Sequence, residues 1–467
     1  MKDADVKNLT DIVGADWIIT DLEQKSAYFY DEIERALRPV ANEQSIVVKP
    51  KNTEELSAIM AYAYEQEIPV VIRGGGTGLC GGATPVVESL ILSMERFKKI
   101  IQIDEDNMMA ELEAGVTLRE LLDELEGHKG IAFPVHPGDE GAQIGGMVTT
   151  NAGGARAVRH GIMRNHIKGL EVVLPDGEVL KLGGRLLKDN AGYSLMNLLT
   201  GSEGTLAAIT KVILRLYPED KYSATLAIAF ADMDQASAAV LEIIKSGVSP
   251  LAVEYQDKKL NLETAAYLGL HWPLDEGEAD LMIILSERSE AALYLACEQI
   301  EAICRKHQAV KAVYAGTKKE QAELLMIRSG SYEIIQELIA HNLDMAVPPA
   351  RVPEFMRGLR KLAEKYGTRT NIVAHIADGN VHNDILLEDG KIPAFTPDLL
   401  KEMYELCFQL GGTITGEHGV GKLRLADLKL QKNNRELELM KQIKKIFDPK
   451  GILNPGTVVQ IDGCNKN

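Results

Sequence analysis

Three histidines and a glutamate in the last quarter of this 467-residue chain are of the types and spacing that could hold a metal ion. Two of the histidines begin and end the run His375-Ile-Ala-Asp-Gly-Asn-Val-His382, and Glu417 and His418 follow in Thr415-Gly-Glu-His-Gly-Val-Gly421. Two histidines and a carboxylate at separate loop or strand positions can ligate Zn²⁺ or Fe²⁺ and leave coordination positions open for substrate oxygens. A single histidine is more often structural, but the set indicates a metal-dependent reaction.

The second of these runs also matches most of an ATP-binding P-loop. Gly416, Gly421 and Lys422 have the required spacing, but Leu423 stands where a Ser or Thr must bind Mg²⁺. The sequence therefore argues against a nucleotide triphosphate site here.

A first glycine-rich loop, Arg73-Gly-Gly-Gly-Thr-Gly-Leu-Cys-Gly-Gly-Ala83, follows a strand-like run. Its glycines allow the backbone to turn several N–H groups toward an anion such as a phosphate. Gly76, Gly78 and Gly81 also form a G-x-G-x-x-G pattern, but a Rossmann site needs a helix to begin at the third glycine. Here the chain continues through Pro85 into a second β-like run, so a Rossmann site is not expected.

Two further glycine clusters follow the first. One extends from Pro137-Gly-Asp139 through Gly145-Gly146 to Thr149-Thr-Asn-Ala-Gly-Gly154, with His160-Gly161 after it. The other is Thr200-Gly-Ser-Glu-Gly-Thr-Leu-Ala-Ala-Ile-Thr210. A single cluster of this kind is weak evidence, but three in this order indicate an extended cofactor site.

The elements that must position these residues fall into three segments. The first alternates strand-like runs (45–50 and 68–72) with an amphipathic helix that we expect to begin at an N-cap at Thr53. The middle segment, about 221–370, alternates β runs with long helices, which is typical of an α+β domain. Its expected strands include 224–230 and 281–285, and its expected helices are 233–246 and 289–307. Glycine-rich sequence resumes after Asn371, so the last segment is expected to return to the active site.

The three loops resemble those of the vanillyl-alcohol-oxidase/PCMH flavoprotein superfamily. Over nearly the whole chain the similarity is to its D-2-hydroxyacid dehydrogenase branch, which includes a flavoprotein component of glycolate oxidase. This resemblance implies an α+β fold with a PCMH-type two-subdomain FAD-binding domain (1–218) and an α+β cap domain for the substrate (219–410). It also implies a C-terminal segment (411–467) that completes the active site and packs on the FAD domain.

The resemblance further implies which residues contact the flavin. They lie in the three glycine loops and in the late motif Ile452-Leu-Asn-Pro455, and are Arg73, Gly74, Gly75, Gly76, Thr77, Gly78, Pro137, Gly138, Gly145, Gly146, Thr150, Asn151, Gly153, Gly154, Gly161, Glu203, Gly204, Ile209 and Asn454. Many relatives tether the flavin through a histidine at the position of Thr77, and threonine cannot form that bond. FAD is therefore predicted to be bound non-covalently.

The pattern H-x-x-D-G-N-x-H followed by G-E-H-G also resembles the pattern found in the D-2-hydroxyacid dehydrogenase branch. The resemblance implies a role for each histidine and for the glutamate of the candidate metal set. His375, His382 and Glu417 match metal ligands, and His418 matches the catalytic base. Arg328 and Asn383 match positions that contact substrate, and an arginine is suited to a carboxylate.

The implied reaction is oxidation of a D-2-hydroxy acid to a 2-oxo acid, with hydride transfer to flavin N5. Overall resemblance favours D-lactate as the substrate, and glycolate and D-2-hydroxyglutarate are the alternatives. The ligand set does not distinguish Fe²⁺ from Zn²⁺. A non-catalytic flavin electron-transfer subunit is the alternative, but such a subunit would be expected to lack the histidines and glutamate of the metal set.

Composition restricts the partners. A net charge of −17 argues against a nucleic-acid surface. The N-terminus has no signal-peptide pattern, and no stretch approaches the ~20 apolar residues that span a bilayer, so a cytoplasmic protein without a transmembrane segment is expected.

The five cysteines are not grouped as iron–sulfur ligands. Electrons are therefore expected to pass to a separate redox protein, and the resemblance suggests an electron-transfer flavoprotein in an electron-bifurcating complex.

Overall fold

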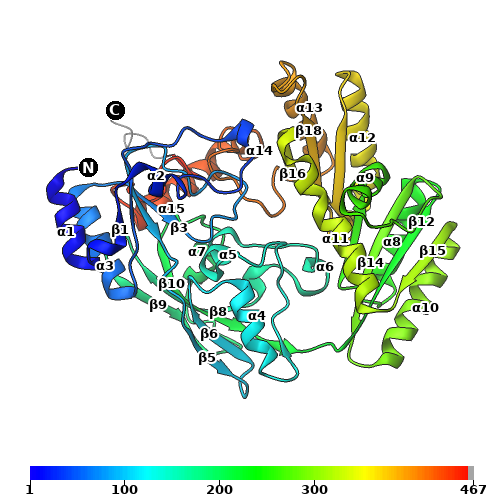
Figure 1. The fold of residues 1–467 in the computed structure, drawn as a ribbon, viewed down its shortest axis with the longest axis horizontal. Coiled ribbons are helices and arrows are strands. Elements are labelled where there is room, and N and C mark those ends of the chain that lie inside the picture. The colour runs from blue at the N-terminus through cyan, green and yellow to red at the C-terminus, as the bar shows by residue number, and fades with distance from the viewer. Residues whose placement is uncertain (461–467) are drawn as a thin grey trace.

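The computed structural model describes residues 1–460, so Cys464 and the end of the expected 411–467 segment lie outside the described residues. The chain has the α+β fold of the PCMH type. Its N-terminal half and a second sheet-containing half stand side by side in Figure 1, and the C-terminal helices in orange and red return to the N-terminal half.

The N-terminal domain contains a small sheet with the strand order β1-β2-β4-β3. Strands β2, β4 and β3 run parallel, and α3 connects β2 to β3. The elements of this part are α1 (Asp3–Val13), β1 (Ile18–Ile19), α2 (Leu22–Ser26), β2 (Ile46–Val48), α3 (Thr53–Gln66), β3 (Val70–Arg73) and β4 (Leu90–Ser93).

A larger antiparallel sheet with the order β5-β6-β10-β8-β9 shares one apolar core with the small sheet. The first glycine loop follows β3, the second contains α5, and the third leads into β10. The elements are β5 (Ile100–Asp104), β6 (Met109–Glu113), α4 (Leu118–Glu126), α5 (Ile144–Thr150), α6 (Ala157–His160), β8 (Ile167–Val173), β9 (Val179–Gly183), α7 (Leu195–Leu199) and β10 (Ala208–Arg215).

The second half is built on a seven-stranded antiparallel sheet with the order β15-β12-β14-β13-β17-β18-β16. Its strands are β12 (Tyr222–Phe230), β13 (Ala252–Gln256), β14 (Ala279–Glu287), β15 (Ala309–Ala315), β16 (Ile339–Ala346), β17 (Thr370–His375) and β18 (Asn380–Leu386). Its helices are α8 (Met233–Lys245), α9 (Lys258–Leu268), α10 (Glu290–Lys306), α11 (Lys318–Ile335), α12 (Val352–Lys365) and α13 (Thr396–Gln409).

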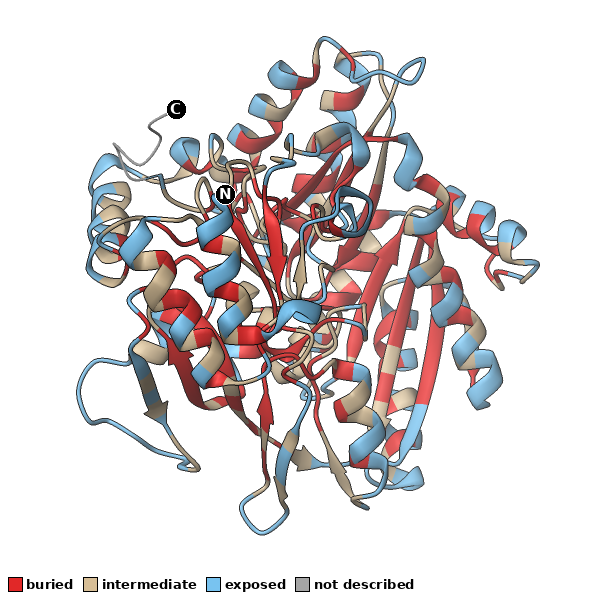
Figure 2. Cartoon of the chain, turned by 60° about the vertical axis from the view of Figure 1, so that its left-hand side comes forward, coloured by how far each residue is buried: buried red, intermediate tan, exposed pale blue. Residues whose placement is uncertain are grey.

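The two faces of this sheet differ in chemistry because side chains alternate along each strand. Apolar residues of one face form a core with α8, α10, α12 and α13, which is why the strands are largely red in Figure 2. Helices α9 and α11 cover part of the other face. Eight polar side chains of β13, β16, β17 and β18 lie on that second face, in register with one another: Glu254, Gln256, Asn342, Asp344, His375, Asn380, His382 and Asp384.

The C-terminal segment, with α14 (Leu428–Gln431) and α15 (Asn434–Phe447), returns to the N-terminal domain. Leu453 forms a parallel bridge with Val70 of β3, and Ile452 and Leu453 are part of the N-terminal core. A buried ion pair fixes this return, because Lys444 Nζ lies 2.5 Å from Asp448 Oδ2 and also donates to the Thr205 and Leu453 carbonyls.

Most expected elements are present, with shifted ends. Helix α3 has its N-cap at Asn52, whose side chain accepts from the Glu55 N–H, so the predicted cap at Thr53 was one residue late. The first glycine loop leads into β4, which lies beside β3 in parallel, and no helix begins at its third glycine. This confirms that the loop is not a Rossmann site.

Within residues 1–460, no helix combines the length and the apolar character that crossing a membrane requires.

The Asp448 pair yields a stability prediction. Asp448→Ala should lower the free energy of unfolding by about 3–5 kcal/mol, because it removes a buried carboxylate that compensates the Lys444 ammonium and accepts the Ile452 and Leu453 N–H groups. Urea unfolding followed by circular dichroism measures the change. Glu405→Gln, which removes the exposed Lys401–Glu405 pair on α13, is the control and should cost at most about 1 kcal/mol. Equal midpoints for the two variants would show that the buried pair does not hold the C-terminal return.

Candidate active site

A cavity follows the three glycine loops and ends at the Glu417–His418 segment. Most of the predicted flavin contacts line it: Gly74, Gly75, Gly76, Thr77, Gly78, Pro137, Gly145, Gly146, Thr150, Gly153, Glu203, Gly204, Ile209 and Asn454. The loops are far apart in sequence, yet the fold brings them to one continuous wall.

Five predicted contacts do not line this cavity: Arg73, Gly138, Asn151, Gly154 and Gly161. The Arg73 guanidinium donates to the Tyr30 carbonyl and lies against Gly76. Asn151 ends α5 in a left-handed conformation, with φ of 53°.

The cavity wall fits a bound flavin nucleotide. A Cβ on Gly75 would lie 2.7 Å from the Gly141 carbonyl oxygen, so that glycine is needed for the loops to pack together. A Cβ on Gly146, in contrast, would meet no described heavy atom within 4 Å and would project into free space at the cavity. Gln143, which the sequence did not indicate, lines the cavity with a side-chain oxygen that has no partner among residues 1–460.

Two cavity residues connect the third glycine loop to the C-terminal segment. Both carboxylate oxygens of Glu203 accept backbone N–H groups, from Val420 at 2.8 Å and Gly421 at 2.7 Å. Asn454 accepts from the Ile72 N–H and donates to the Glu203 carbonyl. Glu203 thus shapes the cavity through the loop it holds.

The three predicted metal ligands converge. Glu417 Oε1 lies 3.4 Å from Nε2 of His375 and 3.4 Å from Nε2 of His382. The three ligand atoms lie within 4.8 Å of one another. His375 ends β17, His382 lies in the adjacent β18, and Glu417 comes from the loop after α13. The other Glu417 oxygen accepts the Gly154 N–H at 2.6 Å, which joins this cluster to the second glycine loop.

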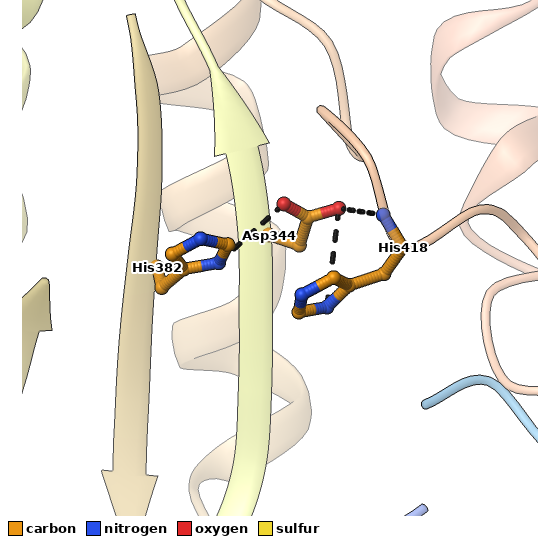
Figure 3. A group of neighbouring side chains, drawn as sticks. All are labelled: Asp344, His382 and His418. Carbon is orange, nitrogen blue, oxygen red and sulfur yellow. Dashed lines mark hydrogen bonds and ion pairs between the residues drawn. The ribbon is translucent and has the colours of Figure 1, made fainter. Parts of the chain in front are cut away.

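Each histidine of the cluster has a carboxylate behind it. His375 Nδ1 lies 2.7 Å from Glu254 Oε1, and His382 Nδ1 lies 3.5 Å from Asp344 Oδ1. Carboxylates in these positions orient the rings and leave both Nε2 atoms for a metal. Figure 3 shows Asp344 between His382 and His418.

Asp344 also organises the loop that carries Glu417 and His418. Its Oδ2 accepts the Thr415 hydroxyl and the N–H groups of Gly416, Glu417 and His418, at 2.7–3.1 Å. Asp344, His382 and His418 are also close enough together to suggest a second metal site. A second ion is not expected there, because Asp344 Oδ2 already accepts four hydrogen bonds.

The cluster is strongly polarised. Burial alone would raise the pKa of Glu417, but hydrogen bonds and charge from His375 and His382 outweigh it and hold that pKa well below its ordinary value. Burial alone would lower the pKa of His375, but Glu254 and Glu417 raise it well above its ordinary value. Burial alone would raise the pKa of Asp344, but charge from His418 and His382 outweighs it and lowers that pKa to about 2.

His418 differs from the other two histidines. It lines the cavity with Glu417, and its ring stacks on that of His382 at a centroid distance of 5.0 Å. Burial lowers its pKa to about 4, against the opposing effect of Asp344. The ring is therefore neutral at physiological pH and able to accept a proton.

The two predicted substrate contacts have different outcomes. Arg328 on α11 pairs with Glu254 Oε2 at 2.7 Å, so one carboxylate holds both Arg328 and His375. Asn383 follows His382 and therefore points to the opposite face of the sheet, which packs on α12 and α13. There its Oδ1 accepts the Thr370 hydroxyl, and its side-chain nitrogen contacts the Met403 sulfur. The structure does not bring Asn383 to the cluster, because neighbouring side chains in a strand face opposite ways.

Glu254 and Asp344 were missed in the sequence. The available signal was a carboxylate inside an otherwise apolar strand, in Ala252-Val-Glu-Tyr-Gln256 and in Leu343-Asp-Met345. A charge is rarely buried without a partner. The identity of the partners, however, depends on strand pairing.

Two family comparisons cover most of the chain. The FAD binding domain family matches residues 44–183, and the C-terminal domain of FAD linked oxidases matches residues 219–458. The second match includes both the expected cap domain and most of the expected C-terminal segment.

Relatives of known name match over almost the full length. D-lactate dehydrogenase of Archaeoglobus fulgidus is 42% identical over 443 residues, which are 95% of this chain and 98% of that protein. Glycolate oxidase subunit GlcD of Bacillus subtilis is 33% identical, covering 89% of each chain. The solved structure of p-cresol methylhydroxylase matches with a TM-score of 0.76 at 18% identity, covering 98% of this chain and 97% of the other, and supports the fold alone.

The open space beside Gly146 yields a test of the cavity. Gly146→Val should fold normally but lose bound flavin, because the added side chain enters the space at the cavity wall. The ratio of visible flavin absorbance to protein absorbance, together with the melting temperature, measures this. Gly184→Val is the matched control, since its Cβ also meets no described atom within 4 Å and it does not line the cavity. Full flavin content in Gly146→Val would place the cofactor elsewhere.

Proposed function

Because this chain belongs to the family of FAD-linked oxidases and is an FAD-dependent hydroxy-acid dehydrogenase, we propose that it oxidises D-lactate to pyruvate. The two named relatives described above act, by their names, on D-lactate and on glycolate. Glycolate is the second candidate on that basis, and D-lactate is preferred because its relative is the more similar of the two over nearly the whole chain.

One observation carries this proposal. Glu417 contacts His375 and His382 through one oxygen and the Gly154 N–H of a flavin loop through the other. The candidate metal cluster, the candidate base His418 and the cofactor cavity therefore share a wall. A substrate held at the cluster would be next to the cofactor that must accept its electrons.

His375, His382 and Glu417 would hold a divalent ion, with two nitrogen donors and one oxygen donor that suit Zn²⁺ or Fe²⁺. Bound there, the ion would lower the pKa of the substrate hydroxyl, and the flavin would supply a two-electron acceptor. Without an ion, the raised pKa of His375 means that its protonated ring balances part of the negative charge of Glu254 and Glu417.

The protein residues then have distinct roles. Arg328 pairs with the substrate carboxylate, and its Nε has no hydrogen-bond partner in the described part of the chain. Neutral His418 accepts the hydroxyl proton. With FAD held in the cavity, the flavin would supply the acceptor for the α-hydrogen and its electron pair, and the C–O single bond would become a carbonyl. Lactate thus loses two electrons and two hydrogens, and pyruvate is released.

We further propose that FAD is bound without a covalent link. Thr77 lines the cavity where relatives place a tethering histidine. The nearby Cys80 thiol is not a replacement, because it lies 2.7 Å from the Arg424 guanidinium and burial raises its pKa to about 12. A thiol in that state is a poor nucleophile.

A separate redox protein, an electron-transfer flavoprotein, is the proposed electron acceptor. A flavin reduced in each turnover must be reoxidised, and the five cysteines of the sequence contain no iron–sulfur ligand group through which this chain could pass the electrons on.

The metal and the base can be tested separately. His382→Ala should lose bound metal and most turnover but retain FAD, because His382 does not line the flavin cavity. His418→Asn should retain both metal and FAD and lose turnover by about 10²–10⁴-fold, the usual contribution of a general base. Metal analysis, flavin absorbance and dye reduction with D-lactate give the three readouts. Normal turnover in both variants would contradict the assigned roles.

The acceptor is tested by reconstitution. The isolated holoenzyme should reduce an artificial dye with D-lactate but should not reduce NAD⁺, and addition of an electron-transfer flavoprotein should open a route to a physiological acceptor. Stopped-flow reoxidation of the reduced flavin, with and without that partner, measures the transfer. Rapid NAD⁺ reduction by the chain alone would show that no partner is needed.

A further inference from the structure

Strand β18 and helix α11 each carry residues that follow the metal cluster and its Arg328 neighbour. Along β18, Asp384 follows His382 on the same face, and along α11, Tyr332 lies one turn after Arg328. Val373 of β17 is paired with His382. A substrate with its carboxylate at Arg328 and its hydroxyl at the cluster would direct its remaining carbons toward this region.

This region is tightly packed. Val373 is 8% exposed and packs with Ile335 and Ile339, and Tyr332 contacts the same group. Asp384 is 4% exposed and Gln256, beside Val373 on β13, is 2% exposed. A long substrate chain could enter only by displacing these side chains.

The far end of the region is acidic, and the N-terminal domain contributes to it. Glu34 precedes the short helix η2 (Arg35–Leu37), which contacts β16. Glu34 is 4% exposed, and neither of its carboxylate oxygens has a hydrogen-bond partner within residues 1–460. Burial, assisted by the nearby charge of Asp384, raises the pKa of Glu34 to about 7. Asp384 is part of the same region, and its Oδ1 accepts the Asn342 side-chain N–H at 2.6 Å.

The cations near these acids are engaged elsewhere. Arg424 donates to Cys80 Sγ and to the carbonyls of Gly419 and Asn342. Its Nε has no hydrogen-bond partner within residues 1–460, but the side chain is fully buried and closed to a substrate group. Arg38 donates to the Ile33 carbonyl and lies over the Tyr30 ring. A second substrate carboxylate would therefore meet Glu34 and Asp384 instead of a free guanidinium or ammonium group.

We propose that this region is the specificity wall of the site, in which Val373 and Tyr332 limit the length of the substrate and Glu34 and Asp384 exclude a second carboxylate. The substrate class is then a short 2-hydroxy monocarboxylic acid. This inference rests on the proposed function, because it assumes that Arg328 and the metal cluster bind the hydroxy acid.

A substrate panel on the holoenzyme tests the class. Glycolate, D-lactate, D-2-hydroxybutyrate, D-malate and D-2-hydroxyglutarate are compared by kcat/KM with an artificial dye. The expected result is that both dicarboxylates fall at least about tenfold below D-lactate, since even one misfit methylene in a closed pocket costs about 10–200-fold. A dicarboxylate that equals or exceeds D-lactate overturns the inference and leaves the proposed reaction type intact. If none of the acids is oxidised, the proposed function itself is wrong.

Variants test the named residues. Glu34→Gln combined with Asp384→Asn should raise the ratio of D-malate to D-lactate kcat/KM by roughly tenfold, because neutral amides that can donate hydrogen bonds replace two acids. Val373→Ala should shift preference toward D-2-hydroxybutyrate by roughly tenfold. Glu337→Gln, an exposed residue that pairs with Arg35 at the same domain contact, is the control and should change neither ratio.

Flavin content and melting temperature establish that each variant is folded. Unchanged ratios in folded variants overturn the assignment to Glu34, Asp384 and Val373. If a variant does not fold, the panel on the unaltered holoenzyme still decides whether the site prefers short monocarboxylates.

Discussion

The geometry of the active site depends on one buried carboxylate, that of Asp344. Fully buried in β16, it accepts hydrogen bonds from Thr415 and from three successive N–H groups, and it stands behind His382. A buried charge is tolerated only when it is compensated, and here the compensation comes from the loop that carries Glu417 and His418. The cost of burying Asp344 is thus offset by contacts that place the candidate ligand and the candidate base.

The same loop is held from its other side by the N-terminal domain. Glu203 accepts the N–H groups of Val420 and Gly421, while the N–H of Gly154 is donated to Glu417. Residues 415–421 therefore lie between two carboxylates from different domains. This arrangement joins the cofactor cavity to the cluster, so a change in domain contact would change both sites together.

The proposed chemistry needs one protonated or metal-bound histidine and one neutral histidine close together. His375 faces two carboxylates, which raise its pKa, whereas burial dominates at His418 and lowers its pKa. Two residues of the same type acquire different roles from their surroundings. The proposed specificity wall beyond His382 extends this principle, because its buried acidic side chains offer no cation to a second substrate carboxylate.

The sequence by itself determined what depends on local spacing: the three glycine loops, the His375–His382 run and the Glu417–His418 pair, and from their resemblance the PCMH-type fold. It could not determine contacts made by strand register. Asn383 follows a candidate ligand in the chain yet faces the opposite side of the sheet, while Glu254 and Asp344, far away in the chain, lie directly behind the two histidines. Local motifs record which chemical groups are present, but pairing between distant strands decides which of them meet, and that pairing exists only once the sheet has formed.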